Sequence, residues 1–168
     1  MDNRTEVERI KATNNLASMP ANPWEFDVDL GIFPDDALSR ILAVIGEIAK
    51  HSSDAWPTDE EWRAVLPAWL RQNLPELTKE ETDRLLAATP RDQWDTLPWE
   101  FGSWIDAVRD RGWKWWGYKQ EGASATLVLH IAMFPERIDA FKEILRAAGL
   151  RLVAERYEAL DHGLAISR

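Results

Sequence analysis

Two segments of the chain share one pattern of hydrophobic and polar positions. In residues 24–33, apolar side chains alternate with acidic ones, and Phe33-Pro34 then leads into an amphipathic stretch at 35–50. Residues 126–149 repeat this order, with Phe134-Pro135 between a β-rich run and a second amphipathic stretch. Alternation indicates a strand with one buried face, and apolar positions three and four residues apart indicate a helix with one buried stripe. The pattern therefore predicts two strand–helix units of the same construction, with corners that superimpose.

The segment between these units, residues 51–112, carries short helical patterns separated by prolines. Thr58 and Thr78 are each followed three residues later by glutamate, a capping-box signature of a helix start. A third helix is expected to begin near Pro98 and to end at Gly112. We therefore predict a helical insertion, and it is rich in tryptophan, with Trp56, Trp62, Trp69, Trp94 and Trp99 among its residues.

Three further strands are predicted after the insertion. Two β-rich runs follow it at 113–119 and 125–134, and alternation returns at 150–157. The order β-α-insertion-β-β-α-β resembles that of the ferredoxin-like α+β sandwich, a split βαβ arrangement. The resemblance implies an antiparallel sheet with helices on one face, built from the halves 24–50 and 113–157.

The length of the chain and its N-terminal segment complete the expected organisation. With 168 residues and 45% hydrophobic content, the chain fits a single domain, 1–168, with one core. Residues 1–22 carry only a thin apolar stripe, so we expect a loosely packed N-terminal arm. Ten tryptophans exceed the needs of one core, so we expect many of them at least partly at the surface.

Acidic residues are concentrated in the first two-thirds of the chain. The formal net charge is -9, and residues 21–100 alone hold 17 acids against 7 bases. A surface of this sign repels nucleic acid and anionic membranes and steers cationic partners toward it. The chain has no cysteine, no apolar leader and no apolar run long enough to span a bilayer, which favours a cytoplasmic protein without membrane contact.

The common catalytic motifs are absent from the sequence. It contains no phosphate-binding loop, dinucleotide glycine fingerprint, nucleophile elbow or histidine-pair zinc motif. Its only histidines are His51, His130 and His162. We therefore predict no catalytic residue, no cofactor and no metal, and we expect a binding protein rather than an enzyme.

The acidic, tryptophan-rich insertion is the leading candidate for a binding surface. Aromatic anchors supply buried area at protein interfaces, and surrounding carboxylates accelerate the encounter with a basic partner. Trp94 stands outside any clear apolar stripe, whereas Trp62 and Trp69 lie on one and are expected to pack internally. The alternative is that the tryptophans form a local core and the acids only cap helices. The candidate partner-binding residues are Asp59, Glu60, Glu80, Glu81, Asp83, Asp92, Trp94 and Asp95.

An acidic, cysteine-free, single-domain chain without a catalytic set is similar in general character to bacterial toxin-immunity proteins. That resemblance implies a cytoplasmic protein that neutralises a cationic protein partner such as a toxin. An inhibitor that mimics the charge of nucleic acid is a related interpretation.

The open face of the predicted sheet is an alternative site. Asp27, Asp29 and His130 are expected to share it, with Trp116 or Tyr118 nearby. Two carboxylates and an imidazole can bind a metal ion or transfer protons, although a polar sheet face without a site is the plainer interpretation. A ferredoxin-like ligand-binding or enzymatic domain would use this face, and a homo-oligomeric regulatory domain would associate through the sheet. The aromatic–lysine run at 113–119 is also typical of a nucleic-acid stacking platform, but its acidic neighbours repel phosphate.

Overall fold

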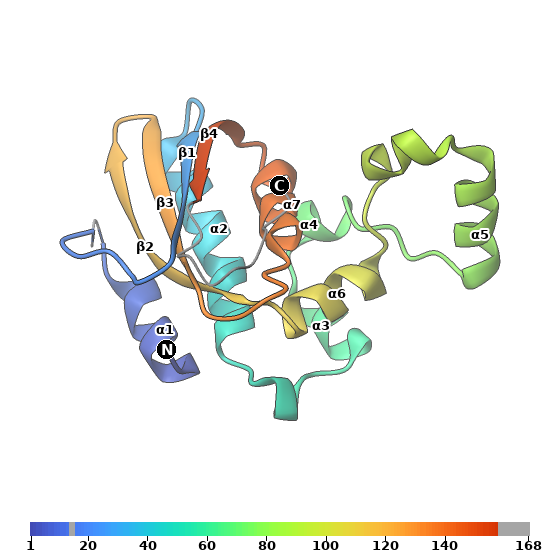
Figure 1. The fold of residues 1–168 in the computed structure, drawn as a ribbon, viewed down its shortest axis with the longest axis horizontal. Helices are drawn as coiled ribbons and strands as arrows, with labels where there is room; N and C mark the ends of the chain where they lie inside the picture. Colours follow the sequence, from blue (N-terminus) through green and yellow to red (C-terminus); the bar gives the residue numbers. More distant parts are fainter. Residues whose placement is uncertain (14–15, 158–168) are drawn as a thin grey trace.

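A four-stranded antiparallel sheet forms the centre of the molecule. The computed structural model describes residues 1–13 and 16–157. The strands are ordered β2-β3-β1-β4, so β1 and β3 are central and β2 and β4 are the edges (Figure 1). Their bounds are β1 (Pro23–Asp29), β2 (Trp113–Glu121), β3 (Ser124–Ile131) and β4 (Arg151–Tyr157). The prediction of an α+β protein built on an antiparallel sheet is confirmed.

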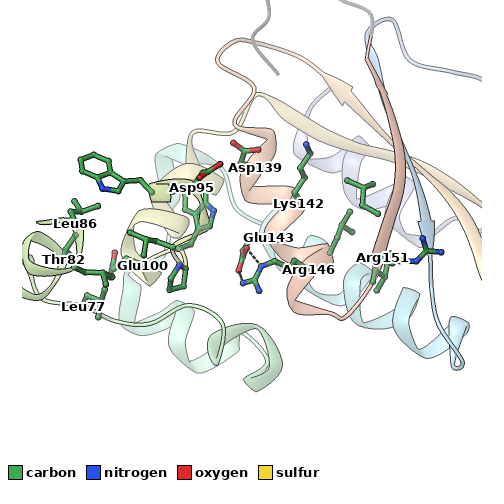
Figure 2. A pocket seen from close by; sticks show the side chains of 18 residues that line it. Leu77, Thr82, Leu86, Asp95, Glu100, Asp139, Lys142, Glu143, Arg146 and Arg151 are labelled. Carbon is green, nitrogen blue, oxygen red and sulfur yellow. Dashed lines mark hydrogen bonds and ion pairs between the residues drawn. The ribbon is translucent and has the colours of Figure 1, made fainter. Parts of the chain in front are cut away.

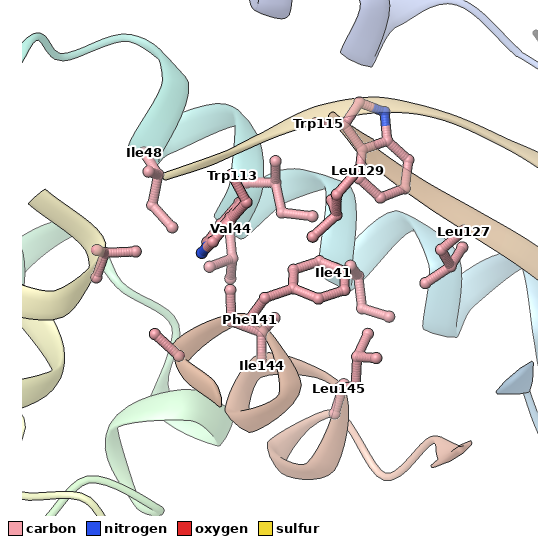
Figure 3. Packing of buried hydrophobic residues seen from close by; sticks show 14 of the residues in the cluster. Ile41, Val44, Ile48, Trp113, Trp115, Leu127, Leu129, Phe141, Ile144 and Leu145 are labelled. Carbon is pink, nitrogen blue, oxygen red and sulfur yellow. The ribbon is translucent and has the colours of Figure 1, made fainter. Parts of the chain in front are cut away.

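Two helices follow the central strands and pack against the sheet. They are α2 (Pro34–Ala49), which follows β1, and α7 (Ile138–Ala147), which follows β3. β1 alternates buried and half-buried residues along its length, because it turns one row of side chains toward these helices. Figure 3 shows part of the resulting core, in which apolar side chains of α2, β2, β3 and α7 meet: Ile41, Val44, Ile48, Trp113, Trp115, Leu127, Leu129, Phe141, Ile144 and Leu145.

The N-terminal segment contains a helix, α1 (Asn3–Lys11), that packs against the edge strand β2. The Glu6 carboxylate is fully buried and accepts hydrogen bonds from the Arg111 guanidinium (2.9 and 3.0 Å) and from the backbone N–H of Trp115 (2.6 Å). Arg9 donates to the Trp116 carbonyl oxygen at 2.6 Å. Because α1 supplies these hydrogen-bond partners to backbone groups of β2, it protects this edge strand from pairing with another chain. These buried contacts correct the expectation of a loosely packed arm.

Residues 51–112 form a series of short helices between α2 and β2. They are α3 (Asp59–Val65), α4 (Ala68–Arg71), α5 (Lys79–Ala88) and α6 (Phe101–Arg109), with 3-10 turns η1 (Ser53–Ala55) and η2 (Arg91–Thr96). α3, α4 and α6 contribute to the core, as do residues just after α3 and just after α4, through these buried side chains: Trp62, Leu66, Leu70, Leu74, Phe101, Trp104 and Ile105.

Part of this segment, residues 75–100 with α5 and η2, projects away from the body and is here named the helical extension (Figure 1). The Phe101 N–H donates to the Pro75 carbonyl oxygen at 2.9 Å and so closes the base of the extension. None of its residues is buried. The extension is therefore held at its base and carries no core of its own.

The two Phe-Pro corners differ in structure, so the expectation that they superimpose is not met. Pro34 is the first residue of α2, whereas the Phe134–Pro135 peptide bond is cis and α7 begins three residues later. Arg137, just before α7, has a left-handed backbone with φ 55°. The second corner is bound to the α6–β2 junction, because the Gly112 N–H donates to the Glu136 carbonyl oxygen at 3.1 Å.

The tryptophans divide evenly between the core and the surface. Five are fully buried: Trp24, Trp62, Trp104, Trp113 and Trp115. The other five are at least partly exposed: Trp56, Trp69, Trp94, Trp99 and Trp116. The expectation that many tryptophans lie at least partly at the surface is therefore confirmed, and Trp94 is the most exposed of the ten.

Candidate functional site

A wide groove lies between the helical extension and the layer formed by α7 and β4 (Figure 2). Its volume is about 900 Å³, and most of its lining is apolar. The extension supplies one wall: Leu77, Thr82, Leu85, Leu86, Trp94, Asp95, Leu97, Pro98, Trp99 and Glu100. The other wall comes from α7, the turn after it and the start of β4: Asp139, Lys142, Glu143, Leu145, Arg146, Leu150, Arg151 and Leu152.

Capping and residue spacing set the orientation of α5 along this groove. The Thr78 hydroxyl accepts from the Glu81 N–H (3.1 Å), and the Glu81 carboxylate accepts from the Thr78 N–H (3.3 Å), so the predicted capping box is confirmed. Thr82, Leu85 and Leu86 are three and four residues apart and share the face that borders the groove. Because the extension buries no residue, this apolar face of α5 remains half-exposed.

Trp94 is the exposed aromatic side chain of the groove. It is 39% exposed, and its indole N–H donates to the Thr89 carbonyl oxygen at 3.0 Å. The Arg91 guanidinium lies 5.5 Å from the centre of its ring. These contacts restrain the indole, so that it offers a rigid apolar surface, which lowers the entropy lost on binding.

The basic side chains of the groove are all paired with carboxylates. Lys142 pairs with Glu155 at 2.8 Å, Arg151 with Asp29 at 3.3 Å, and Arg146 with Glu143 on the same helix. The hydrogen bonds that Arg146 donates to the Glu143 carboxylate raise the pKa of its guanidinium.

Three acidic side chains in the groove have no basic partner among the described residues, namely Asp95, Asp139 and Glu100, of which Glu100 instead caps α6 by accepting from the Ser103 N–H. Asp95 and Asp139 belong to opposite walls, and neither takes part in an ion pair within residues 1–13 and 16–157. Figure 2 shows both carboxylates at the same end of the groove. Since each groove cation is neutralised by a partner, the uncompensated charge of the groove is negative, and it favours a cationic ligand.

The strand that borders the groove is an edge of the sheet. β4 pairs with β1 on one side, and no described strand pairs with its other side. Leu152 and Val153 on this strand are 38% and 55% exposed. An edge strand with exposed apolar side chains is a template on which an extended segment of another chain can add.

The structure brings together only two of the partner-binding residues predicted from the sequence. Trp94 and Asp95 line the groove. Asp59 and Glu60 lie on α3, outside it. The remaining four are exposed on the helical extension but do not line the groove: Glu80, Glu81, Asp83 and Asp92.

Sequence reasoning missed the second wall of the groove. Asp139 lies in the first turn of α7, where an acid is commonplace, so its position alone carries no functional signal. The adjacent apolar residues Leu152 and Val153 interrupt the alternation of the last strand, and this interruption is a signal that could have indicated an exposed edge.

The open face of the sheet does not gather the residues proposed for the alternative site. Asp27 accepts from Arg156 (2.6 Å) and from the Thr126 hydroxyl (2.9 Å), and these hydrogen bonds lower its pKa, that from Arg156 most. Asp29 accepts from the Gly31 N–H and pairs with Arg151. Both carboxylates are therefore engaged in structural contacts.

His130 lies apart from these carboxylates. It lies opposite Pro23 where β3 pairs with β1. Pro23 is four residues before Asp27 in β1, which corresponds to about 13 Å along the strand. Its ring lies 6.4 Å from that of Trp116, and burial lowers the pKa of the imidazole. Among the residues that the structure describes, no three His, Asp or Glu side chains lie close enough together to hold a metal ion.

Tyr118 was expected near the open face of the sheet, but it lies on the opposite face. Simple alternation places it beside Lys114 and Trp116, but β2 has a bulge between Trp115 and Gly117. One extra residue in a strand turns every following side chain to the other face. Tyr118 is consequently buried in the core.

Comparison with known proteins gives no family model, no curated relative and no solved structure that matches this chain. In the described part of the chain, no helix combines the length and apolar character needed to cross a bilayer.

Proposed function

We propose that this protein binds a cationic partner protein in the groove between the helical extension and the α7–β4 layer. The observation that carries the proposal is the helical extension itself, whose residues are nowhere buried and whose apolar face borders the groove. A segment whose apolar side chains stay partly exposed within its own chain gains most from a partner that covers them. The unpaired Asp95 and Asp139 add the preference for positive charge.

The edge strand β4 supports a specific mode of capture. A partner segment added to β4 would lie about 4.8 Å beyond it. Alternate side chains of that segment would then descend into the groove toward Leu85, Leu86 and Trp99. Backbone pairing supplies affinity in this mode of recognition, and the pockets for alternate side chains supply specificity.

The functional class proposed is that of a small acidic inhibitor that neutralises a basic protein, of the toxin-immunity type. The concentration of acids in residues 21–100 and the absence of cysteine support it. The fold is proposed to be the ferredoxin-like split βαβ with a helical insertion. The antiparallel order β2-β3-β1-β4 and the helices that follow the two central strands support that assignment.

The double variant Asp95→Lys with Asp139→Lys reverses two of the unpaired groove charges. It is expected to slow association with the partner about tenfold or more at low salt. Rim charges act mainly on encounter, so dissociation should change much less. Trp94→Ala should instead speed dissociation, at a cost of about 2 kcal/mol or more of binding free energy. The measurement is surface plasmon resonance at several salt concentrations, with the partner isolated by affinity capture from the producing organism.

The matched control is Glu8→Lys with Glu121→Lys, which changes the net charge equally at exposed sites outside the groove. It should leave the association rate within about threefold of the original. The proposal fails if the partner is acidic, or if the groove pair and the control pair behave alike. Capture of a second copy of the chain would support the homo-oligomer instead.

A further inference from the structure

A second, smaller pocket lies where the start of α1, the turn after α2 and the start of β2 meet. It shares no lining residue with the groove. Its volume is about 190 Å³, and the described residues that line it include no carboxylate. Its polar lining is instead dominated by cations and by groups that can donate hydrogen bonds: Asn3, Ser52, Ser53, Arg109, Arg111 and Lys114.

Lys114 is the cation of this pocket that lacks a carboxylate partner. Its ammonium lies 3.3 Å from the Asn3 side-chain oxygen, and no described carboxylate lies within ion-pair distance. Arg111 is neutralised by the buried Glu6, and Arg109 by Asp106 and Asp110. Burial lowers the pKa of the Lys114 ammonium, the nearby Arg111 lowers it further, and the charge of Glu6 offsets these effects only in part. A half-buried ammonium in this position is stabilised by any anion that enters the pocket.

The wall of the pocket also contains an unsatisfied neutral donor, because Trp56 lines it. The Trp56 indole N–H is buried and has no hydrogen-bond partner among the described residues. The His51 ring, beside it, lies edge-on to the rings of Trp56 and Trp62, with ring centres 6.4 and 5.4 Å away. A buried N–H without an acceptor costs about 1–3 kcal/mol, so an acceptor oxygen placed here is favourable.

We propose that this pocket binds a small oxyanion, with inorganic phosphate as its simplest form. The pocket is smaller than the roughly 300 Å³ at which sites for larger ligands begin. A phosphate group offers several strong acceptor oxygens and between one and two negative charges at neutral pH, which suits a lining of donors around Lys114. This inference does not depend on the proposed function of the groove.

The test is a titration of the whole protein with inorganic phosphate at constant ionic strength, followed by thermal melting and by ³¹P NMR line width. The expected result is a saturable rise in melting temperature and a broadened phosphate signal, neither of which chloride produces. Lys114→Gln should weaken binding at least about tenfold, since it removes a charge-assisted contact. Lys119→Gln, on the same strand but exposed and outside the pocket, should bind phosphate as the original does.

Trp56→Phe provides a second variant, which keeps the aromatic ring and removes only the indole N–H. It should also weaken binding, so the inference stays testable if Lys114→Gln does not fold. The inference is overturned if phosphate and chloride act alike. It is equally overturned if phosphate binds but Trp56→Phe and Lys114→Gln lose no more affinity than Lys119→Gln does.

Discussion

The variant Gly112→Ala is expected to lose about 4 kcal/mol or more of the free energy of unfolding. A loss of this size is expected because the added methyl group would overlap with backbone atoms. A Cβ atom at position 112 would lie 2.0 Å from the Met133 carbonyl oxygen and 2.9 Å from the Glu136 Cα. Both neighbours are backbone atoms, so neither can move without shifting the corner before α7. That corner is fixed by hydrogen bonds of Gly112 itself, whose carbonyl oxygen accepts from the Ala132 N–H at 2.7 Å.

The same substitution in the middle of α2 provides the control. At Gly46 the nearest atom to an added Cβ is a methyl carbon of Ile10, at 4.0 Å, so the site has room. Alanine is a better helix former than glycine by about 1 kcal/mol, so Gly46→Ala should stabilise the protein. Urea denaturation of the two variants measures both effects. A loss below about 1 kcal/mol at position 112 would contradict the tight approach of the two backbone segments.

The second large effect is expected at the buried ion pair that holds α1 to the sheet. Glu6→Ala should cost about 3–5 kcal/mol, because it leaves the buried Arg111 guanidinium without its counter-ion. It also removes the acceptor of the Trp115 N–H. Denaturation by urea gives the loss, and Glu8→Ala, an exposed site on the same helix, should stay within about 0.5 kcal/mol of the original.

A double variant separates the ion pair from the packing around it. Replacement of both partners, by Glu6→Leu with Arg111→Met, removes the two charges together and should recover much of the loss. If Glu6→Ala alone costs no more than Glu8→Ala, then α1 is only loosely attached, as the sequence analysis expected.

Local patterns predicted the elements of this fold because each depends on a few neighbouring residues. The alternation in β1, the apolar stripe of α2 and the capping box at Thr78 are all visible in short windows of sequence. The Glu6–Arg111 pair joins residues 105 positions apart, and no local pattern marks it. The face occupied by Tyr118 was predicted wrongly because a bulge in β2 depends on the pairing with β3.

The candidate site was predicted only in part, for the same reason. Trp94 stood out because no apolar stripe accounts for it, and the structure places it in the groove. The facing wall comes from α7 and β4, whose position beside the helical extension follows from the tertiary arrangement alone. Acidic residues such as Glu80 and Asp83 were chosen by charge, and charge does not reveal that they lie away from the groove lining.

Amide hydrogen exchange of the protein, free and bound to its captured partner, tests most directly whether the groove is the binding site. In the free protein the helical extension should exchange quickly, because none of its residues is buried. Binding should slow exchange at residues 79–99 and along the edge strand at 150–156, and it should leave β2 and β3 unchanged. Protection confined to β2 and β3, with none in the helical extension or β4, would contradict the account.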